Sequence, residues 1–237
     1  DKHFTLQNFT WIRPDYPKRK TYKRFRFAAV SKTSIEKQLK SLKSNKATGL
    51  DNLPPKLLKQ CATNISKPLT YIVNLSLKTS TLQTLWKMTK VIPVHKSGST
   101  SITDNYRPIS ILPTLSKVLE RVVHTQLTNF LESNGLIYND QFGYRPRRST
   151  QLASTLLLDK IRREVDQGNL VGAVFIDLRK AFDTISHSVL IDKLPSFGVM
   201  NEELNWLTDY LFDRDQKVEL NKEMSDGFKL LTGVPQG

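Results

Sequence analysis

The sequence has a single cysteine, Cys61, among its 237 residues. One cysteine can form no internal disulfide and no cysteine zinc site, so both kinds of stabilisation are excluded. The four histidines are scattered without metal-ligand spacing, and each is expected at the surface or near a helix end. The longest apolar run is far shorter than a membrane span, and no signal segment opens the chain. No membrane association is therefore expected.

Several widespread catalytic motifs are also missing. The sequence holds no Gly-rich phosphate loop ending in Lys-Ser/Thr, no Gly-x-Gly-x-x-Gly, no His-Glu-x-x-His and no Gly-x-Ser-x-Gly. These absences disfavour P-loop hydrolases, dinucleotide-binding enzymes, zinc proteases and α/β-hydrolases. The hydrophobic fraction of 38% nevertheless suffices for one large core or two modest ones.

Acidic residues are scarce relative to basic ones, which gives a formal net charge of +14. Residues 1–60 hold 15 Lys+Arg and 4 Asp+Glu, a net +11, whereas residues 61–237 hold 21 and 18, a net +3. Aromatic residues lie between the cations at the start of the chain, as in Tyr22 and Phe25. Such a pattern fits phosphate contact with base stacking, although a solvated basic linker explains residues 1–32 equally well.

The central stretch of the sequence runs from Leu170 to Ile176 and ends in Asp177. Its length and β-branched content predict a buried strand. A carboxylate at the end of a buried strand is fixed by the sheet while its oxygens face solvent, which suits a hard cation such as Mg²⁺. Capping of the following helix is the alternative role for Asp177.

Hydrophobic periodicity predicts an α+β fold in two subdomains. A capping box at Thr33 and Glu36 predicts the first helix. Two short strands are expected to form a hairpin with a mobile polar loop, His95 to Pro108. The predicted helices cover about 33–42, 55–61, 65–73, 114–135, 151–167, 186–194 and 201–211, and the remaining strands cover 91–94, 109–112, 216–220 and 228–231.

Four motifs in sequence order identify a family. They are Asn105-Tyr-Arg-Pro-Ile-Ser110, Gln141-Phe-Gly-Tyr-Arg145 with Ser149-Thr150, Asp177-Leu-Arg-Lys-Ala-Phe-Asp183 with Ile185-Ser-His187, and Gly233-Val-Pro-Gln-Gly237. Any one is a weak signal, but together they resemble the reverse transcriptase of non-LTR (LINE-type) retrotransposons. Residues 46–51 and 86–96 extend the likeness upstream, so that only residues 1 to about 32 lie outside it.

Weak periodicity and the excess of basic residues predict a basic, poorly ordered arm over residues 1–32. The resemblance implies helical fingers with a β-hairpin over 33–168, and part of a palm over 169–237 with an incomplete ferredoxin-like sheet. It implies an RNA-directed DNA polymerase, which transfers a nucleotidyl group from a deoxynucleoside triphosphate (dNTP) to a primer 3′-hydroxyl. The implied partners are an RNA template and a DNA primer, and the implied cofactor is Mg²⁺ or Mn²⁺. The sequence does not define the localisation; an intracellular protein with access to the nucleus is expected if the full-length retrotransposon protein is functional.

The resemblance also assigns residue roles. Asp177 is expected as the catalytic metal ligand, together with the backbone carbonyl of Leu178. Phe182 matches the aromatic gate beneath the nucleotide sugar, although on its own it is a core aromatic. Lys96 and Arg107 match the cations that grip the triphosphate, although on their own they are solvated loop charges. The other nucleotide-binding residues implied are Lys180, Ala181 and Gln236, and the nucleic-acid-binding residues implied are Arg145, Arg147 and Arg148.

One departure from the family pattern bears on activity. The second acidic motif of the family, an aromatic-Ala-Asp-Asp sequence, is absent, and the 237 residues contain no Asp-Asp pair. The sequence is therefore interpreted as truncated after the Gly-Val-Pro-Gln-Gly motif and inactive alone. A non-catalytic nucleic-acid-binding remnant is the alternative. A group II intron-type reverse transcriptase is a nearer alternative, and residues 105–110 disfavour it.

Overall fold

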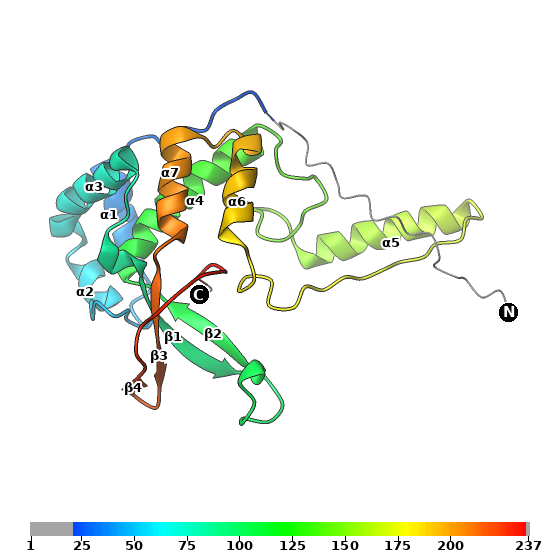
Figure 1. Cartoon of the computed structure of the whole chain (residues 1–237). Coiled ribbons are helices and arrows are strands. Elements are labelled where there is room, and N and C mark those ends of the chain that lie inside the picture. The colour runs from blue at the N-terminus through cyan, green and yellow to red at the C-terminus, as the bar shows by residue number, and fades with distance from the viewer. Residues whose placement is uncertain (1–20, 236–237) are drawn as a thin grey trace.

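The computed structural model describes residues 21–235, and its helices gather into a body from which a twisted sheet and one long helix project (Figure 1). The mixture of helices with one small sheet confirms the α+β class. The α-helices are α1 (Lys32–Lys40), α2 (Pro55–Gln60), α3 (Ala62–Thr79), α4 (Thr114–Ser133), α5 (Thr150–Asp166), α6 (His187–Lys193) and α7 (Asn201–Leu211). The 3-10 helices are η1 (Thr84–Lys87), η2 (Thr103–Asn105) and η3 (Leu194–Phe197).

The strands are β1 (Met88–His95), β2 (Tyr106–Ile111), β3 (Asp215–Leu220), β4 (Glu223–Met224) and β5 (Phe228–Lys229). The order in the sheet is β2-β1-β3-β4, and β5 also pairs with β3. β1 and β2 pair antiparallel, which confirms the predicted hairpin, whereas β1 and β3 pair parallel. The parallel pair joins segments more than 120 residues apart in the chain.

The core lies between α1, α3, α4 and α7, whose apolar residues recur with helical spacing. Ile35, Leu39, Val73 and Leu119 are fully buried, and Trp206 of α7 is 1% exposed. The Trp206 indole donates a hydrogen bond from Nε1 to Ser76 Oγ at 3.0 Å, which satisfies its polar atom inside the core. In the described part of the chain, no helix is long and apolar enough to cross a membrane.

Residues 21–31 form an extended segment packed on this body, which corrects the predicted arm over that stretch; residues 1–20 lie outside the described residues. Phe25 is 2% exposed and lies against Phe130 with ring centroids 5.4 Å apart. Side-chain amides hold the backbone on both sides. Asn74 accepts from Val30 N and donates to Val30 O, and Gln126 contacts Ala28 in the same two ways. These paired hydrogen bonds replace the strand partner that the segment lacks.

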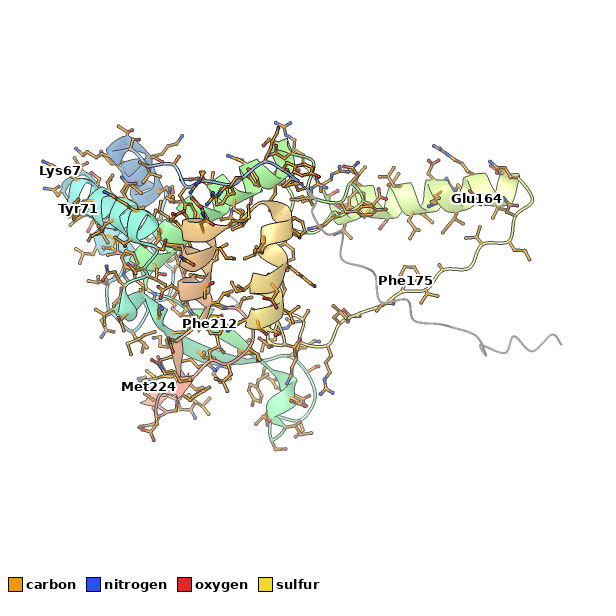
Figure 2. All side chains as sticks on the ribbon, turned by 45° about the horizontal axis from the view of Figure 1, so that its top comes forward. Lys67, Tyr71, Glu164, Phe175, Phe212 and Met224 are labelled. Atoms are coloured by element: carbon orange, nitrogen blue, oxygen red, sulfur yellow. The ribbon has the colours of Figure 1, made fainter. Side chains whose placement is uncertain are left out.

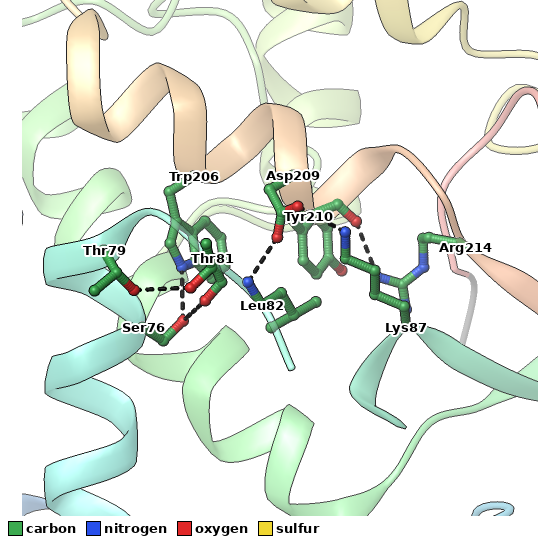
Figure 3. Close-up of polar contacts among 9 residues, drawn as sticks. All are labelled: Ser76, Thr79, Thr81, Leu82, Lys87, Trp206, Asp209, Tyr210 and Arg214. Atoms are coloured by element: carbon green, nitrogen blue, oxygen red, sulfur yellow. Dashed lines mark hydrogen bonds and ion pairs between the residues drawn. The ribbon is translucent and has the colours of Figure 1, made fainter. Parts of the chain in front are cut away.

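Polar contacts along α7 connect the helices to the sheet (Figure 3). Asp209 accepts from the backbone N–H of Leu82 at 2.6 Å and from Lys87 Nζ at 2.8 Å. Arg214 is 1% exposed, donates to Tyr210 O at 3.0 Å and lies over the Tyr210 ring at 4.9 Å from its centroid. Since Lys87 precedes β1 and Arg214 precedes β3, these contacts fix where the two parallel strands begin.

Most helix boundaries agree with the predictions to within three residues, but α3 continues to Thr79, six residues past the predicted end at 73, and the cap of α1 differs. Ser31, and not the predicted Thr33, caps α1 by accepting from Ser34 N. Glu36 instead accepts from Lys40 and from Thr63 of α3, so no capping box forms. Pro113 precedes α4 without a side-chain cap, whereas the Ser186 hydroxyl caps α6 by accepting from Val189 N.

The predicted buried strand from Leu170 to Ile176 is wrong. These residues run extended and exposed beside α5, with Val174 86% exposed and Ile176 84% exposed (Figures 1 and 2). No strand pairs with them among residues 21–235, so neither their backbone groups nor their apolar side chains gain the partner that a sheet would supply. The sequence pattern indicates strand propensity, but no segment among residues 21–235 pairs with this stretch to form a sheet.

The predicted boundary between residues 168 and 169 stays a prediction, although elements on both sides of it share one sheet and one core. β3 pairs with β1, and Trp206 packs among residues of α1, α3 and α4. The segments assigned to fingers and palm are therefore in direct contact.

Candidate active site

The β1–β2 hairpin carries the two predicted triphosphate-binding cations. Val94 pairs with Arg107, and Lys96 N donates to Asn105 O at 2.8 Å, which continues the antiparallel register. Lys96 and Arg107 are consequently diagonal neighbours on one face of the hairpin. Both side chains are exposed, so their charges are available to a ligand.

The tip of the hairpin contacts the loop that carries Asp177. Asp104 in η2 accepts from Arg179 Nη2 and from Lys180 Nζ, both at 2.8 Å. The hydrogen bond from Lys180 lowers the pKa of the Asp104 carboxyl, and the charge of Arg179 adds to this effect. Asp104 thus brings the hairpin with Lys96 and Arg107 to the loop with Asp177. Sequence reasoning missed this residue.

The turn at Phe182 is held by the Gly-Val-Pro motif. Val234 N donates to Phe182 O at 2.9 Å, and Gly233 N donates to Ile185 O at 2.8 Å. Gly233 has φ +82, and a Cβ there would lie 2.7 Å from Asp183 O, so the close approach requires glycine. The Phe182 ring meets Tyr144 edge-on at 5.7 Å between centroids. Three motifs that are far apart in the sequence are therefore in contact.

His187 supports the same turn from inside the protein. It is 3% exposed, its Nε2 lies 2.6 Å from Gly233 O, and its ring packs edge-on against Phe212. A ring nitrogen at that distance from a carbonyl oxygen acts as the donor. His187 therefore fixes Gly233. It lies at the start of α6, as predicted, but it is buried and not at the surface.

A groove of about 410 Å³ lies between the sheet and the chain that leads to the Gly-Val-Pro motif. Thr89, Val91 and Ser110 line its floor, and Asp183 and residues 228–235 line its walls. The groove shares Asp183 and Gly233 with the Phe182 turn, so it opens beside the predicted nucleotide-binding residues.

Asp177 and Leu178 lie in the exposed loop, with Leu178 71% exposed. Residues 21–235 contain no group of three or more His, Cys, Asp or Glu residues able to surround a metal ion. Asp177 offers carboxylate oxygens, which Mg²⁺ and Mn²⁺ prefer, but one carboxylate leaves most of the coordination shell to other ligands. The residues in place therefore fit part of a metal site and do not complete one.

The three predicted nucleic-acid-binding arginines differ in their contacts. Arg145 makes a bidentate ion pair with Glu132, at 2.9 and 2.7 Å, and also donates to Tyr138 O. This pairing lowers the pKa of Glu132 and raises that of Arg145. Arg148 lies over the Phe142 ring at 5.2 Å from its centroid, whereas Arg147 is exposed. Arg145 thus shapes the loop, whereas Arg147 is exposed and Arg148 is half-buried.

Asp104 places the hairpin segment beside Lys180, and Val234 holds the adjoining turn at Phe182. Gln236 lies outside the described residues. The roles of these residues remain predictions. The position of Asp104 beside the Tyr-Arg-Pro motif was the available signal for its importance, but the motif does not reveal its partners.

Comparison with known proteins matches residues 94–237 to the family model described as "Reverse transcriptase (RNA-dependent DNA polymerase)". This match covers more than half of the chain and includes Lys96, strand β2, the Asp177 loop and the Gly-Val-Pro motif.

Curated relatives come from mobile elements. The chain is 32% identical over 210 residues to the "Probable RNA-directed DNA polymerase from transposon BS" of Drosophila melanogaster, covering 86% of this chain and 22% of the relative. It is 26% identical to the "RNA-directed DNA polymerase from mobile element jockey" of the same organism, covering 89% and 23%. It is 29% identical to the "Retrovirus-related Pol polyprotein from type-1 retrotransposable element R2" of Popillia japonica, covering 89% and 28%. The chain thus spans between 22% and 28% of the length of these relatives.

Proposed function

The chain belongs to the reverse transcriptase family, in its non-LTR (LINE-type) branch, and from that premise we propose that it contributes the nucleotide site of an RNA-directed DNA polymerase. The observation that carries the proposal is the Asp104 contact, which joins the hairpin bearing Lys96 and Arg107 to the loop bearing Asp177. Two exposed cations and an exposed carboxylate on adjoining segments are among the groups that nucleotidyl transfer from a triphosphate uses.

Lys96 and Arg107 bind the triphosphate of the incoming dNTP in this proposal. Their positive charges face the same side of the hairpin, so both can contact one phosphate chain and stabilise the charge that develops on it. Lys180, Ala181 and Gln236 complete the nucleotide contacts. Phe182, half-buried against Tyr144, lies beneath the sugar and disfavours a 2′-hydroxyl there by its size.

Asp177 and the Leu178 carbonyl supply part of the shell of Mg²⁺ or Mn²⁺. A bound divalent cation would neutralise charge on the phosphates and acidify the primer hydroxyl. The chain's own contribution is an exposed carboxylate on a loop that Asp104 ties to the hairpin. Because residues 21–235 hold no larger acidic group, the 237-residue chain should be inactive by itself.

An RNA template and a DNA primer are the proposed macromolecular partners. The net charge of +14 favours a phosphate backbone, and Arg147 and Arg148 lie on the loop before α5, where a strand could pass. Arg145 acts by holding that loop in shape through Glu132.

Primer extension on an RNA template tests the proposal, with Mg²⁺ and with Mn²⁺. The assay uses the 237-residue chain and a longer polypeptide that includes an Asp-Asp motif, each with Asp177 intact and as Asp177→Ala. We expect extension only from the longer polypeptide and its loss in Asp177→Ala. Phe182→Ala in the longer polypeptide should raise ribonucleotide incorporation relative to deoxynucleotide. DNA synthesis that survives Asp177→Ala would overturn the assignment.

A second candidate is a non-catalytic nucleic-acid-binding protein. The incomplete metal site favours it, because charge alone suffices for binding while catalysis needs more carboxylates. Salt-sensitive nucleic-acid binding without extension by the longer polypeptide would select this candidate.

A further inference from the structure

The helices α1 to α3 lie at the opposite end of the molecule from α5 and away from the β1–β2 hairpin (Figure 1). Residues 32–78 contain nine lysines, no arginine and two acidic residues, a net +7. All nine lysine side chains are exposed. The nine are Lys32, Lys37, Lys40, Lys43, Lys46, Lys56, Lys59, Lys67 and Lys78.

Little acidic charge offsets these lysines. Glu36 pairs with Lys40 at 2.6 Å and also accepts from Thr63, so it is occupied in joining α1 to α3. Among the described residues, Lys40 is the only one of the nine lysines in an ion pair. Surfaces of soluble proteins commonly mix both signs of charge, whereas this region has nine cations and only two carboxylates.

One stripe of α3 combines two of these cations with an aromatic ring. Lys67, Tyr71 and Lys78 are spaced four and seven residues apart, which places them on the same side of the helix. Tyr71 is 69% exposed, and Figure 2 shows Lys67 and Tyr71 on the outer side of the helix. The opposite side carries Leu69 and Val73 into the core, so the helix is fixed while the stripe faces solvent.

The stripe is about 16 Å long, from the rise of eleven helical residues, which is the length of several nucleotides. Its end at Lys78 borders a cavity of about 430 Å³ that Arg26, Glu202 and Glu203 also line. Those two carboxylates lie 2.8 and 3.6 Å from Arg26 Nη1, so Arg26, and not Lys78, offsets their charge.

We propose that the α3 stripe of Lys67, Tyr71 and Lys78 binds a single-stranded stretch of nucleic acid outside the polymerase site. The lysines contact phosphates, and Tyr71 provides the surface on which a base stacks. The inference rests on the proposed function only in taking nucleic acid as a partner, because the stripe shares no residue with the nucleotide site. It gives the protein a second contact with a template or target strand.

Fluorescence anisotropy with a labelled 20-nucleotide oligothymidylate, measured over a salt series, tests this site on the 237-residue chain. Lys67→Gln with Lys78→Gln should lower the slope of log affinity against log salt by about 1.4, because two phosphate contacts are lost. Tyr71→Ala should weaken binding by about fivefold or more, whereas Tyr71→Phe should retain it. All these side chains are exposed, so circular dichroism should show an unchanged fold.

The matched control is Lys160→Gln with Lys222→Gln, which removes the same charge from exposed positions on α5 and on the β3–β4 turn. It should change affinity and slope less than the α3 pair does. Equal losses in both double variants, or no loss in the α3 pair, would overturn the inference while leaving the proposed function in place. A chain that binds no nucleic acid at all would instead contradict the partner assigned under the proposed function and the stripe together.

Discussion

Asp209 is a single carboxylate on which three segments depend. It accepts from Leu82 N and from Lys87 Nζ, and Lys87 is 8% exposed. Asp209→Ala leaves a buried ammonium and a buried N–H without their acceptor, so we expect a loss of about 2 kcal/mol in the free energy of unfolding. Urea unfolding measures it.

Asp159 provides the control for this prediction. It pairs with Arg163 at 2.6 Å within α5, and both side chains are well exposed. Asp159→Ala should change stability by less than about 0.5 kcal/mol, because exposed pairs are screened by water. If the two variants lose equal stability, the hydrogen bonds of Asp209 to Leu82 and Lys87 do not stabilise the fold more than an exposed ion pair does.

Glu120 gives a prediction about how the stability of the protein depends on pH. Burial raises the pKa of its carboxyl, although Ser116 donates to Oε1 at 2.8 Å and the charge of Arg214 opposes the shift. Because the pKa is higher in the folded state, protonation of Glu120 favours the folded protein. Its contribution to the free energy of unfolding is fully present below the ordinary carboxyl pKa. The contribution is lost as pH rises through the raised pKa. Glu120→Gln should therefore raise the urea midpoint at pH 7 and leave it nearly unchanged at pH 4.

Glu132→Gln is the comparison of opposite sign. Its pKa is lowered by the hydrogen bond from Arg145, so its contribution is present at pH 7 and is lost as pH falls through the lowered value. The variant should lower the urea midpoint at pH 7, with a difference that shrinks in acid. A Glu120→Gln effect of this second sign would contradict the burial argument.

At the residue scale, the sequence predicts which side chains share a local face better than it predicts which distant side chains they contact. The shared face of Lys96 and Arg107 follows from alternation along a hairpin, which is a local rule. The bridge from Asp104 to Lys180 crosses 76 residues, and the pairing of Arg145 with Glu132 depends on how one loop folds back. Such contacts depend on tertiary structure, so a motif can mark these residues without naming their partners.

At the scale of elements, Gly233 decides whether the Gly-Val-Pro motif can lie on the Phe182 turn. Gly233→Ala introduces a Cβ 2.7 Å from Asp183 O at φ +82, so the segment must move away. We expect a loss on the order of 1–3 kcal/mol in the free energy of unfolding. Amide exchange should become faster at positions 233 and 234, whose N–H groups donate to the turn. Hydrogen exchange with mass spectrometry measures the second effect.

Gly227→Ala is the matched control for that substitution. A Cβ at Gly227 would lie 3.5 Å from Lys217 Cε, the end of a flexible side chain, and its φ is outside the left-handed region. This variant should exchange like the unmodified chain. Equal protection in both variants would show that the motif does not depend on the close approach at Gly233.

Elements with a local pattern were predictable, and elements that depend on a partner were not. The helices follow their apolar periodicity, and the β1–β2 hairpin follows its two short apolar runs. The stretch 170–176 has the composition of a strand but no neighbour among residues 21–235. Residues 21–31 show weak periodicity, yet Asn74 and Gln126 hold their backbone through side-chain amides. Amino-acid composition does not predict hydrogen bonds from distant side-chain amides to the backbone.

At the scale of the whole molecule, charge and apolar surface are separated. The lysine-rich helices α1 to α3 occupy one end, and α5 with the extended stretch 169–178 projects from the other (Figure 1). No residue of α5 is buried, and Leu157 lines a cavity together with Val171 and Phe175. Of the described chain, this projecting end therefore holds the largest group of exposed apolar side chains.

That surface predicts self-association of the 237-residue chain. Val174, Phe175 and Ile176 are each more than 80% exposed, and their extended backbone can pair with that of a second copy. Sedimentation velocity should show species larger than a monomer whose fraction rises with concentration. Val174→Lys with Ile176→Lys should restore the monomer, because charges on an exposed strand oppose edge pairing. Leu85→Lys with Ile102→Lys adds the same charge at exposed apolar positions elsewhere and should leave the association unchanged. A chain that is monomeric at every concentration, or an equal effect of both double variants, would show that this stretch is solvated without a partner.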